Sequence, residues 1–115
     1  MLPQRNRIKK KRDFEIIFKN SRSIKNSFLT FRIRKNNLGL DRFGFVVSLK
    51  VSKKATIRNK VRRRMAEAVK AEMKNISLRA KVKIGTDIVL IAMPGIESKK
   101  LFEIKEAIHK ICFNL

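Results

Sequence analysis

A dense run of cationic side chains between residues 50 and 64 is the clearest chemical feature of this sequence. No acidic residue occurs from position 42 to position 66. Eight of the fifteen positions in the run are basic: Lys50, Lys53, Lys54, Arg58, Lys60, Arg62, Arg63 and Arg64. On a helix, like charges four positions apart repel by roughly 0.2–0.5 kcal/mol per pair. A phosphate backbone turns that repulsion into binding, so the run predicts a nucleic-acid-binding surface, with a solvated helix face as the plainer alternative.

Asn59 lies among these arginines and adds a second kind of contact. Its side-chain amide can donate and accept hydrogen bonds, whereas the guanidinium group of arginine only donates. The planar arginine fork suits a phosphate or the edge of a base. We therefore expect Asn59 either to hold an arginine in place or to contact a base, with simple solvent exposure as the alternative.

Three phenylalanines form a second candidate site. Phe14 and Phe18 are one helical turn apart, Phe31 lies in the middle of an expected strand, and Lys50 offers a cation at the edge. Unpaired bases stack on such rings with about 1–3 kcal/mol per base. The set is typical of a groove for single-stranded nucleic acid, and packing of the rings in the core is the competing interpretation.

Residues that could build a catalytic or metal centre are sparse. The chain has one histidine, His109, and one cysteine, Cys112. Neither supplies the several ligands that a protein metal site needs. The carboxylates show no paired spacing and the glycines are isolated, which indicates no nuclease centre and no phosphate-binding glycine loop. We expect no catalytic residue, no metal ligand and no cofactor bound by the protein alone.

The overall composition also favours a polyanionic partner. The chain of 115 residues holds 30 Lys and Arg against 9 Asp and Glu, a formal net charge of +21. Such a charge repels itself in a compact state unless a polyanion neutralises it. Hydrophobic residues make up 43% of the chain, which is enough for a core. We expect a single domain over residues 1–115, with residues 1–10 as a mobile basic N-terminus.

Membrane and secretory signals are weak. The longest apolar run covers the six residues 88–93, far below the roughly 20 that span a bilayer. The basic N-terminus is not followed by the apolar stretch of a secretory signal. The sequence therefore predicts a cytoplasmic protein with no membrane partner.

Hydrophobic periodicity and turn residues predict the order helix, strand, strand, helix, strand, helix, with room for one further short strand before the second helix. The predicted elements are a helix over 11–19, strands over 27–35 and 42–50, a helix over 55–74, a strand over 86–93 and a helix over 98–112. We expect the first two strands to pair as a hairpin and Ser98 to cap the last helix. The fold class is α+β, a small sandwich of helices and sheet, and the general rule favours a right-handed strand–helix–strand crossover.

Two consecutive segments resemble the signature of the bacterial ribonuclease P protein subunits. RFGFVVS at 42–48 resembles the family's strand before its lysines, and ATIRNKVRR at 55–63 resembles its helix of the form Arg-Asn-Arg-x-Lys-Arg. RIKK at 7–10, followed by Asp13, Phe14 and Phe18, is similar to the family's N-terminus. The resemblance extends over nearly the whole chain in length, element order and motif order.

The resemblance implies an accessory role in a ribonucleoprotein. In that family a large RNA cleaves precursor tRNA at its mature 5′ end with Mg²⁺ held by the RNA, and the protein binds this RNA and the single-stranded 5′ leader. The implied contacts to the catalytic RNA are Lys53, Lys54, Arg58, Asn59, Lys60, Arg62 and Arg63. The implied leader cleft consists of Phe14, Phe18, Phe31 and Lys50. The family fold also implies a left-handed crossover, a single RNA-binding domain, and no required protein partner.

The sequence departs from the family pattern at four positions. Leu49 stands where a lysine is frequent, Lys60 where an arginine is usual, and Ala66 where a further arginine is common. Arg64 stands where an apolar residue is usual.

Other functions remain as alternatives. A small ribosomal or other structural RNA-binding protein fits the same charge and fold class. A protein-only nuclease fits less well because no catalytic constellation is present. A helix-turn-helix DNA-binding protein is disfavoured because a strand follows the basic helix.

Overall fold

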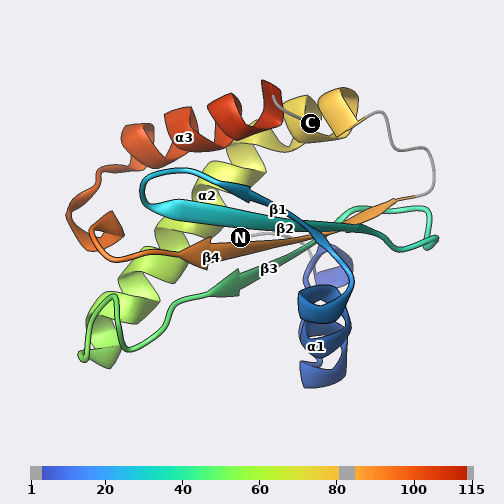
Figure 1. Ribbon diagram of the computed structural model, residues 1–115. Helices are drawn as coiled ribbons and strands as arrows, with labels where there is room; N and C mark the ends of the chain where they lie inside the picture. The colour runs from blue at the N-terminus through green and yellow to red at the C-terminus, as the bar shows by residue number, and fades with distance from the viewer. Residues whose placement is uncertain (1–3, 81–84, 114–115) are drawn as a thin grey trace.

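A four-stranded mixed sheet lies at the centre of the molecule, with helices on both faces (Figure 1). The computed structural model describes residues 4–80 and 85–113. In chain order the elements are η1 (Gln4–Asn6), α1 (Lys11–Lys19), β1 (Arg22–Lys25), β2 (Leu29–Lys35), β3 (Arg42–Val46), α2 (Ala55–Ala80), β4 (Thr86–Ala92), η2 (Ile96–Ser98) and α3 (Leu101–Phe113). The α+β class predicted from the sequence is confirmed.

The last strand in the chain, β4, occupies the interior of the sheet. The strand order is β1-β2-β4-β3, with β4 antiparallel to β2 and parallel to β3. The expected hairpin between the predicted strands 27–35 and 42–50, which correspond to β2 and β3, is therefore wrong. A strand that is apolar on both faces buries the most apolar surface in the middle of a sheet. Nearly all of β4 is buried, which explains its position between β2 and β3.

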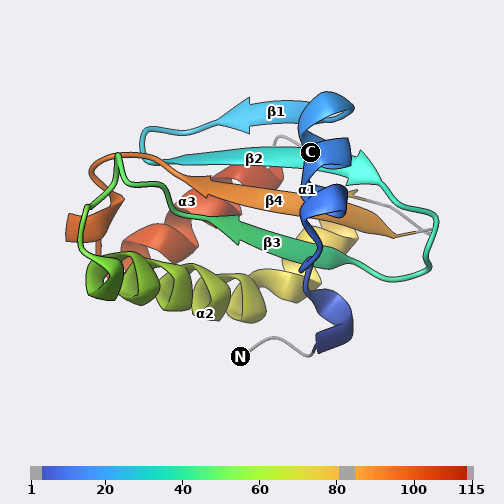
Figure 2. The same cartoon turned by 90° about the horizontal axis from the view of Figure 1, so that it is seen from below.

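The connection β3–α2–β4 has the uncommon left hand. In Figure 2, with α1 toward the viewer, α3 lies behind the sheet and α2 runs along the β3 edge toward that rear side, β3 and β4 both point to the left, and β4 lies above β3. This arrangement is left-handed, as the family resemblance implies and against the general rule for such units.

Several element boundaries differ from the predicted ones. The additional short strand was expected just before the second helix. The structure instead has it as β1, which precedes the predicted strands and pairs with β2. The strand from residue 42 ends at Val46, and α2 extends to Ala80. Ser98 does not cap α3: its hydroxyl donates to the carbonyl oxygen of Gly95, and α3 starts at Leu101. Glu103 takes the capping role by accepting the backbone N–H of Lys100 at 3.1 Å.

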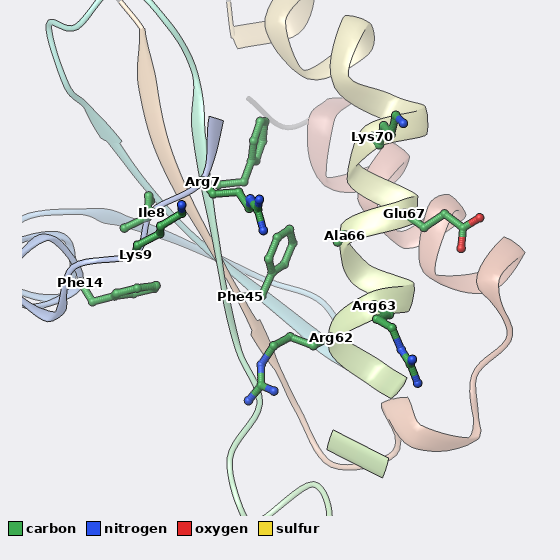
Figure 3. A pocket seen from close by; sticks show the side chains of 11 residues that line it. Arg7, Ile8, Lys9, Phe14, Phe45, Arg62, Arg63, Ala66, Glu67 and Lys70 are labelled. Carbon is green, nitrogen blue, oxygen red and sulfur yellow. The ribbon is translucent and has the colours of Figure 1, made fainter. Parts of the chain in front are cut away.

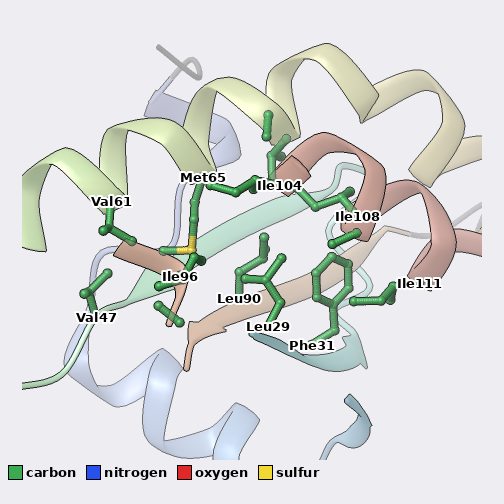
Figure 4. Packing of buried hydrophobic residues seen from close by; sticks show 14 of the residues in the cluster. Leu29, Phe31, Val47, Val61, Met65, Leu90, Ile96, Ile104, Ile108 and Ile111 are labelled. Carbon is green, nitrogen blue, oxygen red and sulfur yellow. The ribbon is translucent and has the colours of Figure 1, made fainter. Parts of the chain in front are cut away.

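The main core lies between the sheet and the pair α2 and α3 (Figure 4). Alternate residues of the strands face these helices, and each helix presents a buried stripe at the three- and four-residue spacing of an amphipathic helix. The fully buried large side chains of this core include Leu29, Phe31, Met65, Leu90, Ile96, Ile104, Ile108 and Ile111. Burial of this amount of apolar surface explains how so cationic a chain remains compact.

A smaller apolar cluster fixes α1 and the N-terminal segment on the opposite face. Ile8, Ile17 and Val89 are buried together there. The Ile8 N–H donates to the carbonyl oxygen of Phe43 at 2.8 Å, and Arg7 forms a parallel bridge with Phe43. Arg7 and Ile8 are therefore attached to the edge of β3, with Ile8 as the apolar anchor. The expected mobility of residues 1–10 stays a prediction, and residues 1–3 lie outside the described residues.

No helix in the described ranges combines the length and apolar character needed to cross a bilayer.

Candidate RNA interface

An open groove, the α1–α2 groove, runs along the β3 edge of the sheet between the N-terminal segment, α1 and α2 (Figure 3). Its volume is about 610 Å³. The lining residues are Arg7, Ile8, Lys9, Phe14, Phe43, Phe45, Arg62, Arg63, Ala66, Glu67 and Lys70. The groove thus combines aromatic rings with five cationic side chains and a single carboxylate.

Phe14 is the one predicted cleft residue that lines this groove. Its ring rests on β3 at Gly44, where an added Cβ would lie 2.6 Å from the ring Cε1 atom. The glycine therefore lets the ring lie flat against the sheet. The half-buried Phe14 side chain packs against the cluster of Ile8, Ile17 and Val89.

Phe18 lies one turn further along α1, beside a cation that sequence reasoning missed. The Phe18 side chain is 37% exposed. The guanidinium carbon of Arg32 is 5.9 Å from its ring centroid, and Arg32 also donates a hydrogen bond to the Phe18 carbonyl oxygen. The alternation of β2 places Arg32 on the face opposite Phe31, and this alternation was the signal that could have identified it.

Phe31 and Lys50 do not belong to this site. Phe31 is completely buried among core residues beneath α2 and α3, so its assignment to the leader cleft is wrong. The strand pattern correctly grouped Phe31 with Leu29 and Ile33, but that face packs against the two helices rather than against α1. Lys50 is exposed in the turn that precedes α2 and is not a lining residue of the groove.

Hydrogen bonds order the first turns of α2. Arg58 donates to the carbonyl oxygen of Ser52 at 2.9 Å and so ties the approach loop to the helix. Asn59 Oδ1 accepts a hydrogen bond from Arg62 at 2.7 Å, which confirms the expectation that Asn59 holds an arginine. Arg62 then lies on the groove side of α2, whereas Arg63 points away from Phe14 (Figure 3).

The remaining cations near the start of α2 divide into two kinds. Lys53, Lys54, Lys60 and Arg63 are exposed to solvent. Arg64 instead donates to the carbonyl oxygens of Glu97 and Lys99, at 3.4 and 3.0 Å. Arg64 therefore anchors the η2 segment and does not take over the contact that the usual arginine at position 66 would provide. Ala66 lines the groove, where its small side chain keeps the space open.

A buried ion pair fixes the sheet beside α1. Asp87 is 2% exposed and accepts two hydrogen bonds from Arg42, at 2.8 and 2.7 Å, and one from Asn36 at 2.8 Å. Asp13 of α1 lies 3.5 Å from the same guanidinium. The hydrogen bonds to Asp87 raise the pKa of Arg42 above its usual value, so the guanidinium stays charged.

Metal-binding and hydrolytic groups do not gather in the groove. Within the part of the chain that the structure describes, no three His, Cys, Asp or Glu side chains are placed to hold a metal ion. The groove offers cations, rings and one carboxylate, a set suited to binding a polyanion.

Comparison with known proteins identifies the family to which this chain is similar. A sequence model of the Ribonuclease P family matches residues 2–115. The ribonuclease P protein component of Alkaliphilus metalliredigens is 35% identical over 103 residues, which cover 90% of this chain and 86% of the relative. The protein component of Clostridioides difficile is also 35% identical, over 104 residues, with coverage of 90% and 86%.

Solved structures agree with the sequence relatives. The RNase P protein from Thermotoga maritima superposes with a TM-score of 0.79 at 27% identity, covering 95% of this chain and 96% of that one. The RNase P protein of Staphylococcus aureus gives a TM-score of 0.77 at 27% identity, with coverage of 92% and 91%. The chain therefore belongs to the ribonuclease P protein component family, and its role lies in that tRNA-processing ribonucleoprotein nuclease.

Proposed function

We propose that this protein binds the catalytic RNA of ribonuclease P through the start of α2 and holds the single-stranded 5′ leader of precursor tRNA beside α1. The observation that carries the proposal is the α1–α2 groove, in which the ring of Phe14 faces the cations of Arg7 and Arg62 across open space. Rings can stack on unpaired bases of any sequence, and the cations can follow the phosphate backbone.

The basic start of α2 supports a separate contact with the catalytic RNA. Lys53, Lys54, Lys60 and Arg63 are exposed in the approach loop and the first turns of α2, and the sequence carries no carboxylate between positions 42 and 66. The hydrogen bonds from Arg58 to the loop and from Arg62 to Asn59 fix the backbone and one side chain of this surface before RNA arrives. A preordered cationic surface loses less entropy on binding.

In this proposal the hydrolysis is carried out by the RNA. The only carboxylate of the groove is Glu67, which points away from the Phe14 side in Figure 3. A lone carboxylate on that side cannot hold the metal pair that phosphodiester cleavage commonly uses. We assign Mg²⁺ to the RNA subunit, and we assign to the protein the binding and positioning of substrate in the cytoplasm, without a further protein partner.

Reconstitution tests the proposal directly. Purified protein is added to transcribed ribonuclease P RNA, and cleavage of precursor tRNA is measured at low Mg²⁺ concentration. We expect the protein to increase cleavage at the mature 5′ end and the RNA to remain inactive at that Mg²⁺ concentration without it. Absence of any stimulation, with retained binding to structured RNA, would favour a structural RNA-binding role of the ribosomal type. Cleavage by the protein alone would favour a protein-only nuclease.

A further inference from the structure

A second concavity, the α1 hollow, lies on the other side of α1 from the α1–α2 groove and encloses about 460 Å³. At about 100° per helical residue, Arg12 and Ile16 of the hollow lie some 160° around α1 from Phe14 of the groove. Its lining also includes Arg34 at the end of β2, Arg42 at the start of β3, and two carboxylates, Asp13 and Asp87. The hollow is therefore a separate surface from the groove.

The register of the sheet leaves an excess of positive charge in the hollow. Asp87 of β4 is paired with Arg34 on one neighbouring strand and with Arg42 on the other. Both carboxylate oxygens of Asp87 bind Arg42, and one also binds Asn36. Asp13, the other carboxylate that lines the hollow, lies 3.5 Å from the same Arg42 guanidinium. Both carboxylates thus serve Arg42, and Arg34 forms an ion pair with neither of them.

Two cations of α1 face the same hollow. Lys10 and Arg12 line it, and among the residues that the structure describes neither they nor Arg34 have an ion pair or a side-chain hydrogen bond. Lys10 is also the N-cap of α1, and no side chain caps the helix there. The free N–H groups of a helix start and three unpaired cations together favour a bound phosphate.

The N-terminal segment connects this hollow to the groove. Arg7 and Lys9 line the groove, and Lys10 and Arg12 from the continuing basic run line the hollow. A single strand that leaves the groove over the start of α1 therefore meets cations on both sides of the helix. Exposed Leu38 at the rim offers an apolar contact for a base.

We propose that the α1 hollow binds phosphates of the precursor's 5′ leader beyond the stretch that lies in the α1–α2 groove, so that a long leader crosses the start of α1. This inference rests on the proposed function. Binding at the hollow should therefore depend on the length of the leader and not on its base sequence.

The test compares precursor tRNAs whose leaders lengthen one nucleotide at a time, bound to the reconstituted holoenzyme. The variant is Arg12→Gln with Arg34→Gln, and the control is Lys100→Gln with Lys105→Gln, which removes equal charge near and within α3. We expect wild type and control to gain affinity in two steps as the leader first fills the groove and then reaches the hollow. The hollow variant should lose only the second step, and its salt slope on long leaders should fall by about 1.4, or 0.7 per lost phosphate contact.

Two outcomes would overturn the inference while leaving the proposed function intact. Equal loss on every substrate, including leaderless tRNA, would assign the hollow to the catalytic RNA, and no loss on any substrate would make it a solvated surface. Failure of the wild type to gain affinity with any leader would instead contradict the proposed function. Crosslinking of 4-thiouridine in the distal leader, mapped by mass spectrometry, checks the wild-type protein directly: adducts should fall between residues 34 and 38, and adducts confined to α2 would contradict the inference.

Discussion

The ring of Phe14 lies so close to Gly44 that a Cβ atom at position 44 would approach its Cε1 and Cζ atoms to 2.6 and 2.8 Å. Contacts of this length do not occur between carbon atoms at rest, so a side chain at position 44 must displace the ring. Since the ring forms a wall of the α1–α2 groove, Gly44 on β3 determines the position of an aromatic residue on α1.

Gly44→Ala should therefore reduce both stability and leader binding. Overpacking of this kind costs about 1–3 kcal/mol of unfolding free energy, which urea denaturation measures. Affinity for leader-bearing precursor should fall, and affinity for leaderless tRNA should not. In a Phe14→Ala background the same substitution should cost much less, because the clashing ring is absent. Equal costs in both backgrounds would show that the two residues are not coupled.

Phe18→Ala and Phe31→Ala should separate the exposed aromatic face of α1 from the core. Phe31 is completely buried, and its loss should cost about 3–5 kcal/mol of unfolding free energy. Phe18 is 37% exposed, so its loss should change stability far less while weakening the binding of leader-bearing precursor. Denaturation and binding to substrates with and without a leader check both variants. Equal weakening by Phe18→Ala on the two substrates would argue for a structural role.

Arg63→Ala should weaken binding to the catalytic RNA without affecting the fold. The side chain is exposed and points away from Phe14, so we expect loss of one phosphate contact and a salt slope shallower by about 0.9. Addition of Arg58→Ala should weaken binding further, because Arg58 also holds the approach loop through Ser52. Filter binding over a range of salt concentrations measures both effects. An unchanged slope in the double variant would mean that neither side chain contacts phosphate.

Asp87→Asn should destabilise the protein by about 3 kcal/mol, because it leaves the Arg42 guanidinium beside a neutral amide in a largely buried site. Glu106→Gln is the matched control, since its ion pair with Lys110 at 3.6 Å is exposed on α3 and such pairs contribute less than about 1 kcal/mol. The difference between the two unfolding free energies measures the buried pair. Similar values for both variants would contradict this role of Asp87.

Local patterns in the sequence predicted local structure well. The helix over Lys11–Lys19 has the predicted bounds, and the two longer helices lie where hydrophobic periodicity predicted helices. These features depend on the spacing of residues within one element, and that spacing can be read directly from the sequence. The role of Asn59 beside Arg62 was predictable for the same reason, because the two residues lie one helical turn apart.

Features that depend on distant partners were not predictable. The alternation of β2 divided Phe31 from Arg32, but it could not say which face would meet α1. Nor could spacing alone show that β4 would separate β2 from β3, or that Arg64 would bind backbone carbonyl groups of the η2 segment. The attachment of Arg7 and Ile8 to β3 was not predicted, because a single apolar residue, Ile8, decides it.

The position of β4 also governs the order of events during synthesis. Strands β2 and β3 share no hydrogen bonds, and each pairs with a strand that the ribosome delivers only when Thr86–Ala92 has emerged. The groove wall at β3, and the start of the chain attached to it, therefore cannot form stably until the last third of the polypeptide has been synthesised. Such non-local pairing slows folding and delays completion of the sheet until β4 is available. A nascent chain stalled before Thr86 would thus carry nearly all of its RNA-binding cations on an unfinished scaffold.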